Sequence, residues 1–100
     1  MEYILCAAIH FKMERIFPHQ PWNIDSGVVI AGWRHHNCIV MRHSLRALYG
    51  EDFTYVQGFL TNTNRFVDRE EAAKIATEAG QTKEGSALHI DGCLTSEDLY

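Results

Sequence analysis

The sequence predicts an α+β domain in which a small, mostly antiparallel sheet is packed by two helices. Three observations lead to this fold class. Residues 3–11 form a near-continuous apolar run, which is typical of a strand with both faces covered. Residues 53–67 hold two apolar segments around a polar turn, as a β-hairpin does. Residues 34–49 and 68–79 carry apolar side chains at helical spacing, and the order of these elements favours antiparallel strands with helices packed on them.

The stretch 57–80 carries the clearest local signals. Its polar run 61–64 separates two apolar segments and contains two asparagines, which tolerate positive φ, so we expect the tip of the hairpin there. Asp68 followed by Glu71 predicts a capping box at the start of the second helix. Gly80 is expected to end that helix in the left-handed conformation.

The segment between the first strand and the first helix is less regular. Residues 12–26 contain two prolines and no sustained period, which predicts a long loop. The large rings of this loop, Trp22 among them, either cover the core or form a flap that stacks on a flat ligand or a partner. Residues 27–33 are expected to form the second strand, and the first helix, 34–49, follows directly and ends at Gly50. The expected apolar face of that helix comprises Cys38, Met41, Leu45, Leu48 and Tyr49.

Length and composition describe a single small domain over residues 1–100. Hydrophobic residues make up 46% of the chain, which is enough for a modest core. A further short strand is expected at 87–90. A small core beside 11 aromatic residues favours a homodimer or a higher homo-oligomer. The net charge of −4 argues against binding to a DNA or RNA duplex or to an anionic membrane, and no apolar run approaches the roughly 20 residues that span a bilayer. Three widely separated cysteines (Cys6, Cys38 and Cys93), with no basic leader before the first strand, indicate reduced thiols in the cytoplasm.

The sequence lacks the motifs of common catalytic and metal centres. It contains no HExxH, CxxC, GxSxG or Walker motif, and the histidines have no metal-ligand spacing. We therefore expect no catalytic residues, no metal and no cofactor, and hence not an enzyme. A cysteine–histidine pair such as Cys38 with His10 stays open as an alternative.

The polar side chains are instead suited to holding an anion that carries flat rings. Guanidinium groups can fork onto phosphate oxygens, aromatic rings can stack on a base, and short amides can bond base edges or ribose hydroxyls. The same arginines could equally be structural and pair with the neighbouring acids, Asp68, Glu70 and Glu71. The candidate ligand-binding residues are Trp22, Arg34, His35, His36, Gln57, Phe59, Asn62, Asn64, Arg65 and Arg69. Arg34, His35 and His36 enter this set because free amides at the start of the first helix would attract an anion beside them.

Several segments resemble the Thoeris anti-defence family of type 1. They are the opening Ile4-Leu-Cys-Ala-Ala-Ile-His10, the central Arg34-His-His-Asn-Cys-Ile39, the run from Gln57-Gly-Phe-Leu through Arg65-Phe-Val-Asp-Arg-Glu-Glu-Ala to Gln81, and the closing Ser96-Glu-Asp-Leu-Tyr100. The resemblance implies a phage protein that works in the cytoplasm of the infected bacterium. Such a protein binds and sequesters, without cleaving it, the cyclic ADP-ribose isomer made by TIR-domain sensors. It also implies a dimer with the ligand near the subunit interface; some members form hexamers that also hold cyclic oligonucleotides.

Two other classes of function stay open at this stage. One is a small phage enzyme that degrades the nucleotide. The other is an inhibitor that binds a host protein through its apolar loop. Recovery of an intact nucleotide from the boiled protein would distinguish sequestration from both.

Overall fold

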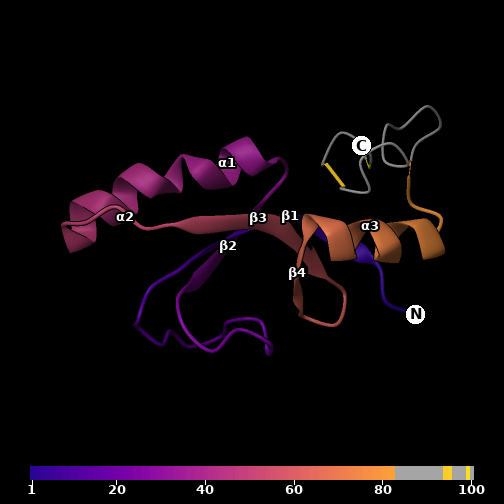
Figure 1. Cartoon of the computed structure of the whole chain (residues 1–100), viewed down its shortest axis with the longest axis horizontal. Coiled ribbons are helices and arrows are strands. Elements are labelled where there is room, and N and C mark those ends of the chain that lie inside the picture. Colours follow the sequence, from indigo (N-terminus) through magenta and orange to yellow (C-terminus); the bar gives the residue numbers. More distant parts are fainter. Residues whose placement is uncertain (83–93, 96–98, 100) are drawn as a thin grey trace.

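The fold was obtained as a computed structural model, which describes residues 1–82, 94, 95 and 99. Its elements are β1 (Ile4–Phe11), β2 (Val28–Gly32), α1 (His35–Ile39), α2 (Met41–Tyr49), β3 (Tyr55–Thr61), β4 (Phe66–Asp68) and α3 (Arg69–Glu78). The expected α+β class with an antiparallel sheet is confirmed (Figure 1). The strand expected at 87–90, and Cys93, lie outside the described residues.

The sheet has the strand order β2-β1-β3-β4, and every strand pair in it is antiparallel. The central position of β1 explains its apolar run, since residues 7–9 and Phe11 are buried. A register shift in the β1–β3 pairing between Ile4 and Cys6 leaves Leu5 as the extra residue, 54% exposed. The bulge re-phases the strand, so Ile4 and Ala7 both face the core although three positions separate them.

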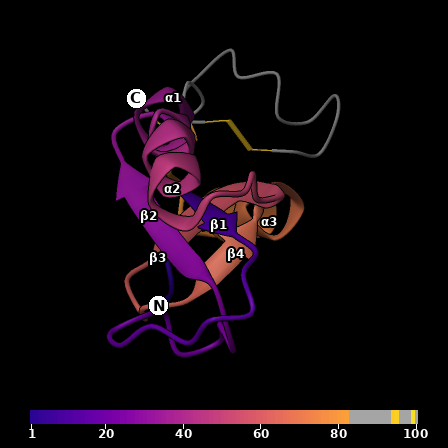
Figure 2. The ribbon, with the colours of Figure 1, turned by 90° about the vertical axis from the view of Figure 1, so that its left-hand side faces the viewer.

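The helices α1, α2 and α3 lie on one face of the sheet. Ala7 packs in the cluster under α3, and Ile9 and Phe11 pack in the cluster under α1 and α2. Side chains two positions apart on a strand point to the same face, so both clusters lie on the same side of β1. The two views agree with this arrangement, and they place the connection between β1 and β2 on the opposite side (Figures 1 and 2).

The first helix differs from its prediction. The single helix expected over 34–49 is divided at Val40, which keeps right-handed helical angles, so α1 and α2 follow one another along nearly one path. The expected apolar face is only partly covered: Cys38 is buried and Leu45 packs on the core, whereas Leu48 is 72% exposed. No residue of α2 is buried, because the helix extends beyond the part of the sheet that α1 covers (Figure 1).

The hairpin and its following helix form as the sequence predicts. Asn64 adopts φ 60° at the tip and donates its N–H to the Thr61 carbonyl. The Asp68 carboxylate accepts the Glu71 N–H at 2.8 Å, which is one half of the expected capping box. Gly80 has φ 70° just after Ala79, the C-cap of α3, and Gly50 has φ 76° directly after α2.

Candidate functional site

The ten predicted ligand-binding residues fall into two separate groups. One group surrounds the hairpin tip and consists of Trp22, Asn62, Asn64 and Arg65. The other lies on the helix side of the sheet or at the start of α1 and consists of Arg34, His35, His36, Gln57, Phe59 and Arg69. The structure therefore does not bring the whole predicted set into one site.

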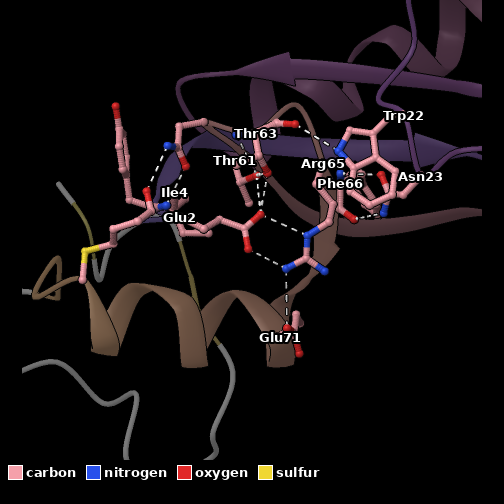
Figure 3. A network of polar contacts seen from close by, with 12 residues as sticks. Glu2, Ile4, Trp22, Asn23, Thr61, Thr63, Arg65, Phe66 and Glu71 are labelled. Carbon is pink, nitrogen blue, oxygen red and sulfur yellow. Dashed lines mark hydrogen bonds and ion pairs between the residues drawn. The ribbon is translucent and has the colours of Figure 1, made fainter.

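In the hairpin group, Arg65 is held by acids of the chain itself (Figure 3). Its Nε and an Nη donate to the two carboxylate oxygens of Glu2, at 3.0 and 2.7 Å. An Nη also lies 3.6 Å from the Glu71 carboxylate. Thr61 and Thr63 donate their hydroxyls to the same Glu2 carboxylate, at 2.8 and 2.7 Å. We call these five residues the Glu2 clasp.

Electrostatics agree with a tightly held carboxylate. The hydrogen bonds from Arg65 and the two threonines lower the pKa of Glu2 from 4.5 to about 2, and burial opposes them only in part. The pKa of Arg65 is raised, first by its hydrogen bond to Glu2. The structural alternative for Arg65 is therefore the one the geometry favours, since Glu2 binds its Nε and one Nη and already neutralises its charge.

The other residues of the hairpin group also bond within the chain. The Asn62 side chain accepts from the Tyr3 N–H at 2.7 Å and donates to the Met1 carbonyl at 3.1 Å. Trp22 donates its indole N–H to the Thr63 carbonyl at 3.0 Å, yet the residue as a whole is 68% exposed. The ring is thus a fixed, solvent-facing surface beside the tip rather than a cover over the core.

Sequence reasoning missed the residues that tie distant segments to the hairpin. Glu2 is one; Asn23 is another, since its side chain pairs with both the N–H and the carbonyl of Phe66. Gln81 instead ties the segment after α3 to β1, since its side chain pairs with the N–H and the carbonyl of Ile4, both at 2.8 Å. A lone polar residue in a loop carries no periodic signal, so only the fold reveals these contacts.

In the helix-side group, His35 sits where α1 meets β3. Its Nε2 lies 2.7 Å from the Gly58 carbonyl, and because that carbonyl can only accept, Nε2 carries the proton. The imidazole meets the Phe59 ring edge-to-face, with 4.9 Å between ring centres. Burial lowers the pKa of His35, the positive charge of Arg69 lowers it further, and the bond to Gly58 opposes both.

Two further predicted residues belong to this side of the sheet. Gln57 lies two residues before Phe59 on the same face of β3 and is half-buried. Arg69, the first residue of α3, donates from Nε to the Leu94 carbonyl at 3.0 Å and accepts the Leu94 N–H at its own carbonyl. We call His35, Gln57 and Arg69 the seam cluster, because α1 packs against β1 and β2 while α3 packs mainly against β3 and β4.

Two sequence expectations for this group need correction. Phe59 is fully buried in the core, so its ring is not open for stacking on a base. The helix that follows Arg34 has only five residues, and the Asn37 side chain already accepts the Arg34 N–H at 2.9 Å, so α1 does not provide the extended helix terminus expected to attract an anion. His36 is exposed and Arg34 half-buried at this point.

A groove that the sequence did not predict lies elsewhere, at the far end of α2. It has a volume of about 660 Å³ and is lined by Lys12, Met13, Glu14, Arg15, Tyr49, Glu51 and Phe53. The Arg15 guanidinium carbon lies 4.7 Å from the centre of the Tyr49 ring, and the Tyr49 and Phe53 rings meet edge-to-face. In this groove the charges of two cations, Lys12 and Arg15, are balanced by two carboxylates, Glu14 and Glu51. The seam cluster instead combines the positive charge of Arg69 with a neutral imidazole.

The thiols and histidines of the described residues show no nucleophilic pairing. Burial raises the pKa of Cys38 to about 11, and its Sγ lies 3.9 Å from the Ala7 carbonyl and 3.7 Å from the Arg34 carbonyl. His10 instead donates to the Ser26 carbonyl at 2.9 Å. Within the described residues no group of three or more metal-ligating side chains occurs, and no helix is long and apolar enough to cross a membrane.

Comparison with known proteins gives one match. Neither the curated proteins nor the solved structures contain a match to this chain. The family model described as "Phage T4 y16D protein" matches residues 3–100, nearly the whole chain. The chain therefore belongs to the phage T4 y16D protein family and is a phage protein.

Proposed function

We propose that this phage protein binds and sequesters a signalling nucleotide, a cyclic ADP-ribose isomer made by TIR-domain proteins, and does not cleave it. Sequestration in the cytoplasm of the infected host would keep the Thoeris effector inactive. The sequence resemblance to the Thoeris anti-defence family motivates this function, and membership of a phage family is compatible with it. A homo-oligomer that holds the ligand near its subunit interface belongs to the same proposal.

The observation that carries the proposal is the seam cluster. A guanidinium has five N–H donors, so the bond from Arg69 Nε to Leu94 leaves it the capacity to fork onto a pyrophosphate. His35 is fixed by Gly58, and Gln57 adds an amide that can bond a ribose hydroxyl or a base edge. Arg34 precedes His35 in the chain and adds a second cation.

The chemistry of this surface suits binding more than turnover. His35 has its pKa lowered and is therefore neutral at pH 7, and it donates to a backbone carbonyl. A protein that sequesters its ligand needs affinity for the ground state and no group that acts only in a transition state. The buried Phe59 does not stack on the base, and the exposed ring of Trp22 belongs to the separate hairpin group.

The decisive experiment is to incubate the protein with the product of an activated TIR-domain protein, remove free nucleotide by filtration, boil, and identify what is released. Release of the intact cyclic ADP-ribose isomer supports the proposal. A cleaved nucleotide would replace it with the enzyme alternative, and release of no nucleotide would favour an inhibitor that binds a host protein.

Calorimetry on variants locates the site. Arg69→Ala should weaken binding at least tenfold, which corresponds to about 1.4 kcal/mol. Lys74→Ala, an exposed cation on the same helix, is the matched control and should bind normally. Because Arg69 also holds Leu94, a melting curve is needed for each variant, and Gln57→Ala tests the cluster without that contact. Loss of binding in Arg15→Ala alone would move the ligand to the groove.

A further inference from the structure

Two side-chain amides bind the sheet in the way that a neighbouring strand would. The Asn23 amide donates to the Phe66 carbonyl at 2.7 Å and accepts the Phe66 N–H at 2.9 Å (Figure 3). The Gln81 amide makes the same two bonds to Ile4, both at 2.8 Å. In an antiparallel sheet, two opposed residues exchange these two bonds. Each amide therefore takes the place of one residue of an absent strand.

Both amides lie on edges where the sheet ends. Phe66 belongs to β4, the last strand of the sheet, and its bonds to Asn23 lie on the side away from β3. Ile4 pairs with β3 on one side of β1, and on the other side the pairing with β2 stops at Ala7. Gln81 therefore fills the part of that side that β2 does not reach.

The loop between β1 and β2 bonds further positions on both outer edges. Trp22 donates its backbone N–H to the Asn64 carbonyl at 3.1 Å, two residues before Phe66. At the opposite edge of the sheet, Gln20 accepts the Val29 N–H of β2 at 2.8 Å. Backbone groups of both outer strands or their extensions are thus already bonded within the chain.

The strands themselves lack the residues that usually prevent pairing between chains. Residues 3–9 and 26–33 contain no charged residue and no proline, which are common means of blunting a strand edge. Uncharged segments of this kind, rich in β-branched and aromatic residues, readily pair with strands of other chains. The bonded amides are therefore what opposes such pairing at these positions.

We propose that Gln20, Asn23 and Gln81 are edge caps, which keep a strand of another chain from adding to this sheet. An added strand would have to displace the amide, because the N–H of Phe66 or Ile4 donates to that amide and can donate only once. The caps hold the sheet at its four strands. This role is separate from nucleotide binding and does not depend on it.

Amide hydrogen exchange of the full chain tests whether the caps hold. In Asn23→Ala the Phe66 N–H should exchange at least tenfold faster than in wild type, and in Gln81→Ala the Ile4 N–H should do so. The N–H of the fully buried Ile9 in the central strand β1 should keep its rate in both variants, which shows that the domain stays folded.

Aggregation tests the consequence of removing a cap. The chains are held at several hundred micromolar, well below their melting temperatures, and followed by thioflavin T fluorescence and by pelleting. Asn23→Ala and Gln81→Ala should form thioflavin-positive aggregates at least tenfold faster than wild type. Asn37→Ala is the matched control and should aggregate as wild type does, because the Asn37 amide accepts the Arg34 N–H at the start of a helix and not at a strand edge.

Three results would overturn the proposal. Unchanged exchange of the Phe66 and Ile4 amides would show that the bonds do not protect the edges. Faster exchange without faster aggregation would reduce the amides to internal ties. Equal acceleration in Asn37→Ala would assign the aggregation to general loss of stability. If a variant loses its Ile9 protection, the other cap decides, and Gln20→Ala, which removes a single bond from Val29, provides a third and milder test.

Discussion

Replacing Glu2 by glutamine should destabilise the whole domain, although the residue lies before the first strand. The Glu2 carboxylate accepts four hydrogen bonds, one each from Thr61 and Thr63 and two from Arg65. Glutamine has nearly the same shape but offers one oxygen and no charge. The variant therefore removes the charge-assisted part of the clasp and leaves Arg65 with only the more distant Glu71 as an acidic partner.

The size of the effect follows from the pKa of Glu2. A fall from 4.5 to about 2 corresponds, at about 1.36 kcal/mol per pH unit, to an upper limit of about 3.4 kcal/mol. The side chain is 26% exposed, so solvent screens the interaction, and we expect about 1–2 kcal/mol at pH 7. Because the folded-state pKa is the lower one, this stability is complete above about pH 4.5 and is lost as the pH falls toward 2.

Thermal melts of wild type and Glu2→Gln at pH 7 and near pH 2 measure this effect. At pH 7 the variant should melt about 5–15 °C lower. Most of that gap should close near pH 2, where the wild-type carboxyl is about half protonated in the folded state and almost fully protonated in the unfolded state. Glu14→Gln, an equal loss of charge at an exposed loop position, should change the melting temperature little at either pH. Equal melting temperatures for wild type and Glu2→Gln at pH 7 would show that the clasp does not hold in solution.

Two further changes test the packing around β3. Gly58→Ala should cost at least about 2 kcal/mol in unfolding free energy, because a Cβ there would collide with the Val67 carbonyl and lie 2.7 Å from the Phe66 ring. Gly80→Ala, with open space but φ 70°, should cost only about 1 kcal/mol, so an equal loss in the two chemical denaturations would contradict the crowding argument. For His35, whose lowered pKa favours the neutral form in the folded state, stability should fall as the pH drops from 7.5 to 5.5. His35→Gln should reduce that fall in paired melts, and an unchanged pH dependence would mean that His35 titrates normally.

The fold class and the hairpin were predictable because their signals are local. Asn64 and Gly80 needed positive φ, and Asp68 needed only the backbone three residues ahead, so neighbouring positions carry all the information. The break at Val40 was not predictable from spacing, since the apolar period continues through it. The spacing of apolar residues predicts that a helix has an apolar face, but it does not show whether another element covers that face. Leu48 belongs to the predicted apolar face and is nevertheless 72% exposed.

The candidate site was less predictable because its residues depend on distant partners. Arg65 and Arg69 cannot be distinguished by their neighbours in the sequence, because each has an acidic residue within four positions. In the fold Arg65 is held by Glu2, which is 63 positions away, whereas the Arg69 side chain donates to a backbone carbonyl. The ring of Phe59 was expected to stack on a ligand. The face of β3 that brings this ring near His35 also buries it in the core under α3.

The clasp also distinguishes the two places where a nucleotide could bind. If phosphate binds to Arg65 at the hairpin tip, it competes with Glu2 for that guanidinium, and Glu2→Gln would strengthen binding by removing the competing carboxylate. If phosphate binds at the seam cluster, Arg65 takes no part, and Glu2→Gln should leave the affinity unchanged at pH 7 while it lowers the melting temperature. Our proposal expects the second outcome, measured by calorimetry well below the melting temperature of the variant. Tighter binding in Glu2→Gln would move the site to the hairpin tip, beside the exposed ring of Trp22.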